Sequence, residues 1–208
     1  MAEQASRPRR LPPGSRLVLA THNPGKLREL RRLFEPFGVE LIGAGELGLP
    51  APAETGASLE ENAALKALAA ARATGLPALA DDSGFFVAAL GGAPGVKSAD
   101  WAMLPDGRRD YRAAMARIAR EAAGNPDRRA AFRCVLALAW PDGHVDVHPG
   151  EVVGSWVHPP RGEGGFGYDP MFIPAHSGLT FGEMTPAEKS ADDHRSRAFA
   201  ALAAAALG

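Results

Sequence analysis

Two adjacent aspartates constrain what this chain can fold into more than any other feature of its sequence. The apolar run 77–80 is typical of a buried strand, and it would deliver Asp81 and Asp82 to a loop that continues with Ser83 and Gly84. Neighbouring carboxylates repel each other. A fold therefore tolerates such a pair only where a cation neutralises it, where the two groups share a proton, or where the side chains point to opposite sides of the strand.

A hard divalent cation is the commonest of these solutions. Carboxylate oxygens without a nearby thiolate or histidine suit Mg²⁺ or Mn²⁺ better than Zn²⁺. Alternatively, Asp81 and Asp82 only cap a turn together with Ser83 and Gly84. Turn chemistry alone does not separate the two interpretations, so the rest of the chain has to decide between them.

The composition indicates an ordinary globular protein. The chain has 208 residues, enough for one large domain or two closely packed lobes, and its 46% hydrophobic content can fill a substantial core. Lys plus Arg (23) nearly balance Asp plus Glu (24), so no overall field attracts nucleic acid and any affinity for anions has to be local. Cys134, the single cysteine, lies in an apolar run and is interpreted as a core residue.

We expect a cytoplasmic protein without a membrane or nucleic-acid partner. No apolar stretch reaches the roughly 18 residues that a membrane span needs, and one cysteine allows no internal disulfide. Residues 1–15 are rich in Arg and Pro but lack the apolar middle of a signal peptide. They are predicted to be a disordered extension, with a basic arm that binds nucleic acid as the alternative.

The first structured segment is predicted to be a strand that leads directly into a helix. The apolar run 16–20 is β-like, Asn23 is a favourable N-cap, and Pro24 suits the first helical position. Free backbone N–H groups and the positive end of the helix make such a loop an anion site, to which Lys26 adds a full charge. The alternative is an ordinary connection with a solvated lysine, and the spacing matches neither the Walker nor the Rossmann glycine motif.

The next segments predict a strand at 37–42 and a loop at 43–56 that carries Glu54. A capping box at 58–61 opens an alanine-rich helix that ends near Thr74. On this helix Glu61 and Asn62 lie one turn before Lys66. That spacing favours a solvated helix face with an i,i+4 pair over a functional role.

The middle of the chain predicts a mixed sheet. A glycine-rich turn spans 91–95, and an amphipathic helix spans 109–123. Residues 130–140 alternate as a strand does, a turn follows at 141–143, and 145–157 supply the return strand. This antiparallel pair adds to the earlier strands, so both strand orientations are expected in one sheet.

The last third of the chain has features of a ligand site. Residues 162–172 are rich in glycine and would allow a flat ligand to approach the backbone while Phe166 or Tyr168 stacks on it, with a plain glycine-rich hairpin as the alternative. Lys189 follows a second capping box. His194 and Arg195 begin the final helix, where cations are electrostatically misplaced, which suggests that an anionic or carbonyl-bearing ligand is held there.

Together these segments make up the inventory of a nucleotide pyrophosphohydrolase: a phosphate-binding loop, an acid cluster that could hold a metal, and a stacking loop with cationic side chains. The sequence also resembles the inosine/xanthosine triphosphate pyrophosphatases, a family that hydrolyses noncanonical purine nucleoside triphosphates. The match follows the family's order and spacing from about Arg16 to the C-terminus. The matching stretches are 19–26, 54–56, 61–63 with residue 66, 80–84, 94–96, 98–99, 165–172, 189 and 194–195.

The resemblance implies an α/β fold with a mixed central sheet flanked by helices. Residues 16–208 would form a single domain with two lobes around a deep nucleotide-binding cleft, and the protein would be a homodimer. It implies hydrolysis of XTP, dITP or ITP to the nucleoside monophosphate and pyrophosphate, with Mg²⁺ or Mn²⁺ as cofactor. Such an activity would cleanse the nucleotide pool.

The resemblance also assigns roles to individual residues. Asp82 would be the general base for the attacking water and a metal ligand, with Glu54 and Asp81 as further ligands. Ser83 and Lys66 would contact the substrate. The triphosphate would be bound by Thr21, His22, Asn23, Pro24, Gly25 and Lys26. The purine would be held by Phe166, Gly167, Tyr168, Asp169, Lys189, His194 and Arg195.

These roles are physically consistent. The attacking water needs a base and the α-phosphate needs charge neutralisation, which Asp82, Mg²⁺ and Lys26 can provide. Cationic donors would read the 6-oxo group of the purine. The amino group of adenine would leave such donors unpaired, and mismatches of this kind discriminate strongly.

Three residues depart from the family pattern. Ala53 stands where many relatives have a second acid, so metal ligation would rest on Glu54 and Asp82 or need water. His22 replaces a usually small residue and would add either a phosphate contact or bulk. Asp193 replaces the common serine before His194; it is an equivalent cap, but its charge is expected to raise the pKa of His194.

Three other functions compete with this one. A pyrophosphatase of the same fold for other modified nucleotides would keep the acid cluster but should lack the set of Lys189, His194 and Arg195. A serine hydrolase using Ser83 and His194 is disfavoured because no nucleophile-elbow motif surrounds Ser83. A non-catalytic nucleotide sensor would bind tightly without releasing pyrophosphate.

Overall fold

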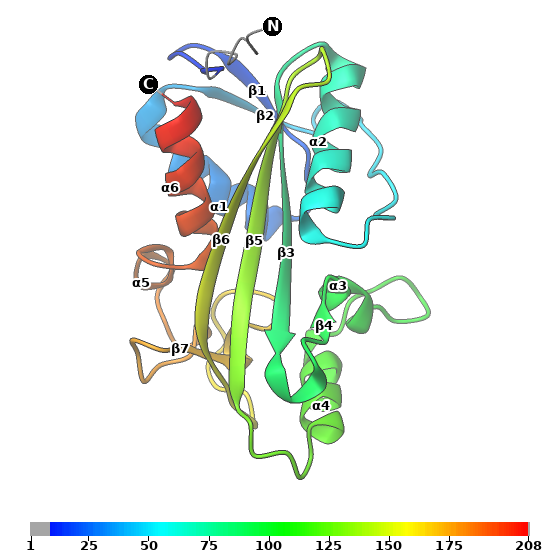
Figure 1. Cartoon of the computed structure of the whole chain (residues 1–208), viewed down its shortest axis with the longest axis vertical. Helices are drawn as coiled ribbons and strands as arrows, with labels where there is room; N and C mark the ends of the chain where they lie inside the picture. The colour runs from blue at the N-terminus through cyan, green and yellow to red at the C-terminus, as the bar shows by residue number, and fades with distance from the viewer. Residues whose placement is uncertain (1–8, 208) are drawn as a thin grey trace, which may run out of the picture.

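A long, curled, mixed sheet forms the centre of the computed structural model, which describes residues 9–207 (Figure 1). Its strands are β1 (Arg16–Leu19), β2 (Glu40–Gly43), β3 (Ala78–Val87), β4 (Pro94–Gly95), β5 (Arg129–Ala139), β6 (Val145–Trp156) and β7 (Phe172–Pro174). The strand order is β2-β1-β3-β5-β6-β7, and β4 pairs with the far end of β3. β1 is parallel to β2 and β3, whereas β3, β5, β6 and β7 are successively antiparallel.

Helices cover both faces of this sheet. They are α1 (Pro24–Phe34), α2 (Leu59–Thr74), α3 (Ser98–Trp101), α4 (Tyr111–Glu121), α5 (Pro186–Ser190) and α6 (His194–Ala206). Short 3₁₀ segments lie at Glu35–Phe37, Ala88–Leu90 and Asp169–Met171. In the upper half of Figure 1, α1 and α6 lie on one side of the sheet and α2 on the other, while α3, α4 and β7 lie in the lower half. Among the described residues, no helix combines the length and the apolar character that crossing a membrane requires.

The buried apolar side chains form separate cores in the two halves. In the upper half, α1 and α6 pack on one sheet face through residues such as Phe34 and Leu202, and the alanines of α2 cover the other face. In the lower half, an aromatic core around Phe85 and Phe172 joins the sheet to α4. The long strands β3 and β5 run through both halves. The expected α/β architecture, a mixed sheet flanked by helices, is therefore confirmed.

The aspartate pair lies inside a strand and not in a loop. β3 continues for ten residues, and Asp81 and Asp82 pair with Leu136 and Val135 of β5. The prediction of a loop after residue 80 is wrong, because β5 extends the antiparallel ladder past the acids. Successive side chains of a strand alternate between its faces, so the two carboxylates point to opposite sides of the sheet.

The helix ends follow the signals in the sequence. The side chains of Asn23, Ser58, Thr185 and Asp193 each accept a hydrogen bond from a backbone N–H in the first turn of α1, α2, α5 and α6, respectively. Gly75 ends α2 with φ +67°, a backbone conformation that favours glycine. Element boundaries are less well predicted, since β2 begins at residue 40 and α4 spans Tyr111–Glu121.

Residues 9–15 contradict part of the predicted disordered extension. Leu11 is buried beside α6, and its backbone N–H donates to the carbonyl oxygen of Ala206 at 2.7 Å. Arg9 forms an ion pair with Asp142 at 2.7 Å. The prediction of disorder is therefore wrong for residues 9–15, because an apolar side chain in this segment completes the upper core. For residues 1–8 the prediction lies outside the described residues.

Candidate active site

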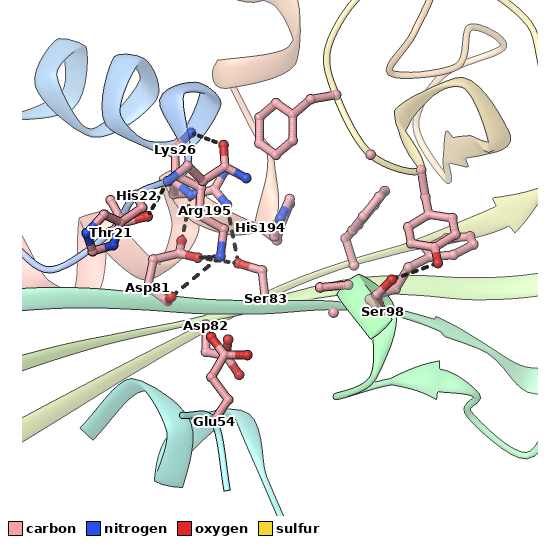
Figure 2. Close-up of a pocket in the computed structure, with 18 of the residues that line it drawn as sticks. Thr21, His22, Lys26, Glu54, Asp81, Asp82, Ser83, Ser98, His194 and Arg195 are labelled. Carbon is pink, nitrogen blue, oxygen red and sulfur yellow. Dashed lines mark hydrogen bonds and ion pairs between the residues drawn. The ribbon is translucent and has the colours of Figure 1, made fainter. Parts of the chain in front are cut away.

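A cleft of about 340 Å³ lies at the middle of β3, where the upper and lower halves of the molecule, here called the upper and lower lobes, meet (Figures 1 and 2). Side chains reach it from the loop between β1 and α1, from β3, from the loop at 166–169 and from the start of α6. Every residue that the sequence analysis assigned to the site lines this cleft, with the exception of Gly25. The fold thus gathers segments that are far apart in the chain.

The loop before α1 is organised by Asn23. Its side-chain oxygen accepts hydrogen bonds from the backbone N–H groups of Gly25 at 2.8 Å and Lys26 at 3.2 Å, and Thr21 Oγ1 accepts from the N–H of Asn23 at 3.2 Å. The backbone N–H groups of Gly25 and Lys26, which we expected to bind an anion, therefore already donate to Asn23. The positive charge of this loop comes from the Lys26 side chain. Gly25 has another function, because a Cβ there would lie 2.8 Å from the Phe166 ring.

His22 contacts the loop that precedes α2. Its Nε2 lies 2.9 Å from the carbonyl oxygen of Leu49, in the loop that later carries Glu54. The imidazole thus links the two loops. From the sequence we expected a phosphate contact or added bulk at this position, and not a link between loops.

Asp81 is fully surrounded by donors on the α1 and α6 side of β3 (Figure 2). Its carboxylate accepts from Arg195 Nε at 2.7 Å, from Ser83 Oγ at 2.7 Å and from Cys134 Sγ at 3.1 Å, and it forms an ion pair with Lys26. Burial alone would raise the pKa of Asp81, but the charges of Arg195 and Lys26 hold it well below its usual range. Asp81 therefore acts as a counterion of Arg195 and Lys26.

Asp82 has a different environment on the α2 side. One carboxylate oxygen accepts from Lys66 Nζ at 2.9 Å, and the same ammonium group contacts Glu54 at 2.7 Å. The other oxygen, Oδ2, is buried and has no hydrogen-bond partner among the described residues. Burial raises the pKa of Asp82 and outweighs the opposing charges of Lys66 and Lys26. This carboxylate is poised to accept a proton or a cation.

The predicted solvated face of α2 is wrong. Lys66 and Asn62 are both buried, and Asn62 accepts a hydrogen bond from the backbone N–H of Gly56 at 2.8 Å. Glu61 caps the N–H of Ala57 instead of pairing with Lys66. The physical reason is that the loop before α2 folds back over the helix, so that this face meets the sheet at Asp82. The i,i+4 spacing contained no information about that loop.

The structure does not bring the three predicted acidic ligands together. Glu54 and Asp82 share Lys66, whereas Asp81 lies on the opposite face of β3. Among the described residues, no three or more His, Cys, Asp or Glu side chains form a group that could hold a metal ion. The pair of Glu54 and Asp82 nevertheless fits a hard divalent cation, because both offer carboxylate oxygens and one of these is a buried oxygen without a partner.

The part of the cleft beside Phe166 combines one aromatic ring with paired cations. Lys189 Nζ lies 4.6 Å from the centroid of the Phe166 ring and contacts Asp169 at 2.8 Å. Glu29 contacts Lys189 at 3.0 Å and also accepts from Arg195. These side chains form one continuous network, which fixes the cations beside the ring.

Of the two predicted stacking residues, Tyr168 is part of the protein core. Its ring stacks on Phe85 with centroids 5.3 Å apart, and its hydroxyl donates to the carbonyl oxygen of Ser98 at 2.8 Å. Gly167, with φ +67°, makes the turn that separates Tyr168 from Phe166. Phe166 is therefore the ring of this loop that remains for a flat ligand.

His194 is buried and neutral. Its ring stacks on Phe132 with centroids 4.8 Å apart, and its Nδ1 has no hydrogen-bond partner among the described residues. Burial and the charges of Arg195 and Lys189 place the pKa of His194 well below its usual value. The expectation that Asp193 raises this pKa is wrong, because the carboxylate of Asp193 is turned to the first turn of α6, where it accepts a backbone hydrogen bond at 2.7 Å.

Glu29 is the residue of this network that the sequence analysis missed. It lies on α1 one turn after Lys26, on the helix face that meets the cleft, and it joins Lys189 to Arg195. An acid three positions after a site lysine on the same helix was the available signal. Its partners, however, lie 160 and 166 positions further along the chain, which no local pattern reveals.

Fold and site together define an α/β protein with a two-lobed cleft, which offers an aromatic ring with cations at one end and carboxylates at the other. The Ham1 family model matches residues 17–205, nearly the whole described chain. The chain belongs to the Ham1 family.

Similar proteins span almost the full length of this chain. The dITP/XTP pyrophosphatase of Gluconobacter oxydans is 54% identical over 194 residues, which are 93% of this chain and 92% of that protein. The dITP/XTP pyrophosphatase of Brucella melitensis is 52% identical over 92% of this chain and 93% of its own length. Among solved structures, a HAM1 protein from Coxiella burnetii has a TM-score of 0.82 at 39% identity and covers 91% of this chain and 97% of its own.

Proposed function

We propose that this protein hydrolyses noncanonical purine nucleoside triphosphates, XTP, dITP and ITP, to the nucleoside monophosphate and pyrophosphate. Relatives with about half their residues identical to this chain are named dITP/XTP pyrophosphatase. A further solved structure, with 43% identity, a TM-score of 0.72 and coverage of 90% of this chain and 98% of its own, is a nucleoside-triphosphatase / dITP/XTP pyrophosphatase from Mycobacterium abscessus.

The observation that supports this reaction most directly is that Oδ2 of Asp82 has no hydrogen-bond partner among the described residues. A buried carboxylate oxygen without a donor is unusual, because desolvation without a hydrogen bond costs free energy. Its raised pKa suits a group that must accept a proton near neutral pH. Asp82 would therefore take the proton of the water that attacks the α-phosphate.

Glu54 and Asp82 are the residues that would hold Mg²⁺ or Mn²⁺, which when bound supplies charge neutralisation for the phosphates and lowers the pKa of water. Lys66 holds the two carboxylates near each other through contacts at 2.7 and 2.9 Å. Lys26, at the N-terminus of α1, would attract the triphosphate to the same region. The chain's own residues thus bind and orient the phosphates beside the base.

The purine would be held at the other end of the cleft. Phe166 offers a ring for stacking, and Lys189 and Arg195 are fixed beside it by Glu29. The unpartnered Nδ1 of His194 would complete the set of groups that meet the base. Donors fixed in this way would favour a 6-oxo purine and disfavour the 6-amino group of adenine, which leaves them unpaired.

The serine-hydrolase hypothesis is not supported by the geometry. Ser83 Oγ donates to Asp81 and accepts from Arg195 Nη2 at 3.2 Å, so it contacts no histidine among the described residues. The ring of His194 is stacked on Phe132. The carboxylate that accepts from Ser83 belongs to Asp81, whose pKa is held well below its usual value by Arg195 and Lys26, so it is too weak a base to activate the hydroxyl.

We further propose that the protein acts as a homodimer in the cytoplasm. The resemblance to the inosine/xanthosine triphosphate pyrophosphatases supports the dimer, and the sequence composition supports the location. Light scattering on the purified protein would measure the mass in solution. A monomer at micromolar concentration would contradict the dimer.

The function is tested by pyrophosphate release from ITP, XTP, ATP and GTP, each with Mg²⁺ and with EDTA. We expect metal-dependent release from ITP and XTP and little from ATP and GTP. Equal release from all four nucleotides would contradict the base recognition described above. Binding of ITP without release would favour the nucleotide sensor.

A further inference from the structure

The basic side chains that line the cleft differ in whether they already form an ion pair with a carboxylate. Lysine and arginine contribute five lining residues, and four of these each contact at least one carboxylate. The pairs are Lys26 with Asp81, Lys66 with Glu54 and Asp82, Lys189 with Asp169 and Glu29, and Arg195 with Asp81 and Glu29. Five carboxylates surround these four cations, so a polyanion would have to share each of these cations with a carboxylate.

Arg109 is the exception. It lines the cleft and is exposed, and its side chain forms no hydrogen bond or ion pair with any residue in the described range 9–207. Arg109 and Glu54 line the same cleft, and Arg109 is close enough for its charge to act on the Glu54 carboxylate, so Arg109 belongs to the acidic end of the cleft. Its guanidinium is available to an incoming ligand at that end.

The backbone under Arg109 is well fixed. Arg109 pairs with Met103 in an antiparallel bridge, and the N–H of Asp110 donates to the carbonyl oxygen of Ala102 at 2.7 Å. The carboxylate of Asp110 caps α4. A free side chain on a fixed loop can be positioned by its ligand without a large rearrangement of the chain.

We propose that Arg109 is a phosphate-positioning residue, whose guanidinium binds the β- and γ-phosphates that leave as pyrophosphate. The proposal rests on the proposed function, because it needs a triphosphate in the cleft. A guanidinium presents a planar fork of donors that matches phosphate oxygens. Arg109 lies at the exposed mouth, so it would meet the distal, solvent-facing phosphates rather than the base.

The position of Arg109 gives the lower lobe a direct part in substrate binding. It lies between α3 and α4, whereas Lys26 and Lys66 belong to α1 and α2 of the upper lobe. A triphosphate held from both sides would link the two lobes. Of the cationic side chains that line the cleft, Arg109 is the one that a phosphate would not have to share with a carboxylate of the described residues.

The test compares Arg109→Ala, Arg109→Lys and the control Arg108→Ala. Arg108 is also exposed, but it is paired with Asp106 and does not line the cleft. Hydrogen bonds to charged groups correspond to roughly 10- to 100-fold in affinity. We therefore expect Arg109→Ala to weaken the binding of ITP and of pyrophosphate by that factor, with a similar rise in KM, and Arg109→Lys to recover part of the loss.

IMP is the discriminating ligand, because it lacks the β- and γ-phosphates. Calorimetry should show the same affinity for IMP in wild type, Arg109→Ala and Arg108→Ala. Equal weakening of IMP and ITP, or no change for either, would overturn the proposal. If wild type releases no pyrophosphate from ITP, the proposed function fails by itself, and Arg109 is then judged on the calorimetric affinities for ITP and pyrophosphate.

Discussion

The two faces of β3 surround the neighbouring residues Asp81 and Asp82 with different sets of hydrogen-bond and ion-pair partners. On the face toward α1 and α6, Asp81 accepts from Arg195, Ser83 and Cys134 and pairs with Lys26. On the face toward α2, Asp82 receives one lysine and keeps an oxygen without a partner among the described residues. Both side chains are buried.

The difference shows that partners, and not burial alone, decide what a buried carboxylate can do. Burial opposes ionisation of both groups, but the pKa of Asp81 ends well below its usual value while that of Asp82 ends above it. The satisfied carboxylate fixes Lys26 and Arg195 in place. The unsatisfied one remains available for a proton or a cation, which is the requirement for chemistry.

The largest expected effect is on turnover in Asp82→Asn. Loss of a general base typically costs about 10²- to 10⁴-fold in kcat, and the substitution also removes a proposed metal ligand. The fold should persist with an unchanged or higher melting temperature, because an amide is less costly to bury than a carboxylate whose pKa is raised. Pyrophosphate release and thermal melting measure the two effects. Retained turnover would remove Asp82 as the base.

In contrast to Asp82→Asn, the substitution Asp81→Asn should mainly reduce the stability of the fold. It leaves Arg195, which is 1% exposed, with Glu29 as its remaining carboxylate partner among the described residues. Breaking a buried pair in this way costs about 3 kcal/mol, or roughly 6–12 °C in melting temperature for a chain of this size. Asp106→Asn, which breaks an exposed pair with Arg108, is the control and should melt as wild type does. Equal melting of all three proteins would contradict the counterion role.

A smaller effect concerns the pH dependence of folding stability, to which the buried His194 on α6 contributes. It is surrounded by Arg195, Lys189, Lys26 and Asp81, and burial with these cations holds its pKa well below 6.5. His194 therefore binds a proton near pH 6.5 in the unfolded chain but not in the folded protein. As a result, the free energy of unfolding falls as the pH drops below that value. The slope is at most about 1.4 kcal/mol per pH unit.

Urea unfolding of wild type and His194→Gln between about pH 7.5 and pH 5 measures this slope. The variant should lose the dependence that the histidine causes, so the difference between the two stability curves should narrow as the pH falls. Parallel curves would mean that His194 titrates normally in the folded protein.

Local signals in the sequence predicted the local structure well. Asn23, Ser58, Thr185 and Asp193 cap their helices, and the apolar run around Cys134 is a central strand of the core. Each of these depends on a few neighbouring residues. The family resemblance added the order of the segments, and all but one of the residues it assigned line one cleft.

What the sequence could not predict depends on contacts between distant segments. β3 continues through the aspartates because β5, about fifty positions later, pairs with it. Lys66 is buried because a loop folds back over its helix, and Tyr168 is a core residue because Phe85 lies beneath it. Spacing along one helix or loop carries no record of such partners. The role of Glu29 was missed for the same reason.

The most direct test of the division between the two aspartates is Mn²⁺ binding in the presence of pyrophosphate, followed by electron paramagnetic resonance. It would compare wild type, Asp82→Asn and Asp81→Asn at a low temperature, at which the less stable variant stays folded. We expect wild type and Asp81→Asn to bind Mn²⁺ and Asp82→Asn not to bind it. Loss of Mn²⁺ binding in Asp81→Asn with retention in Asp82→Asn would contradict this expectation.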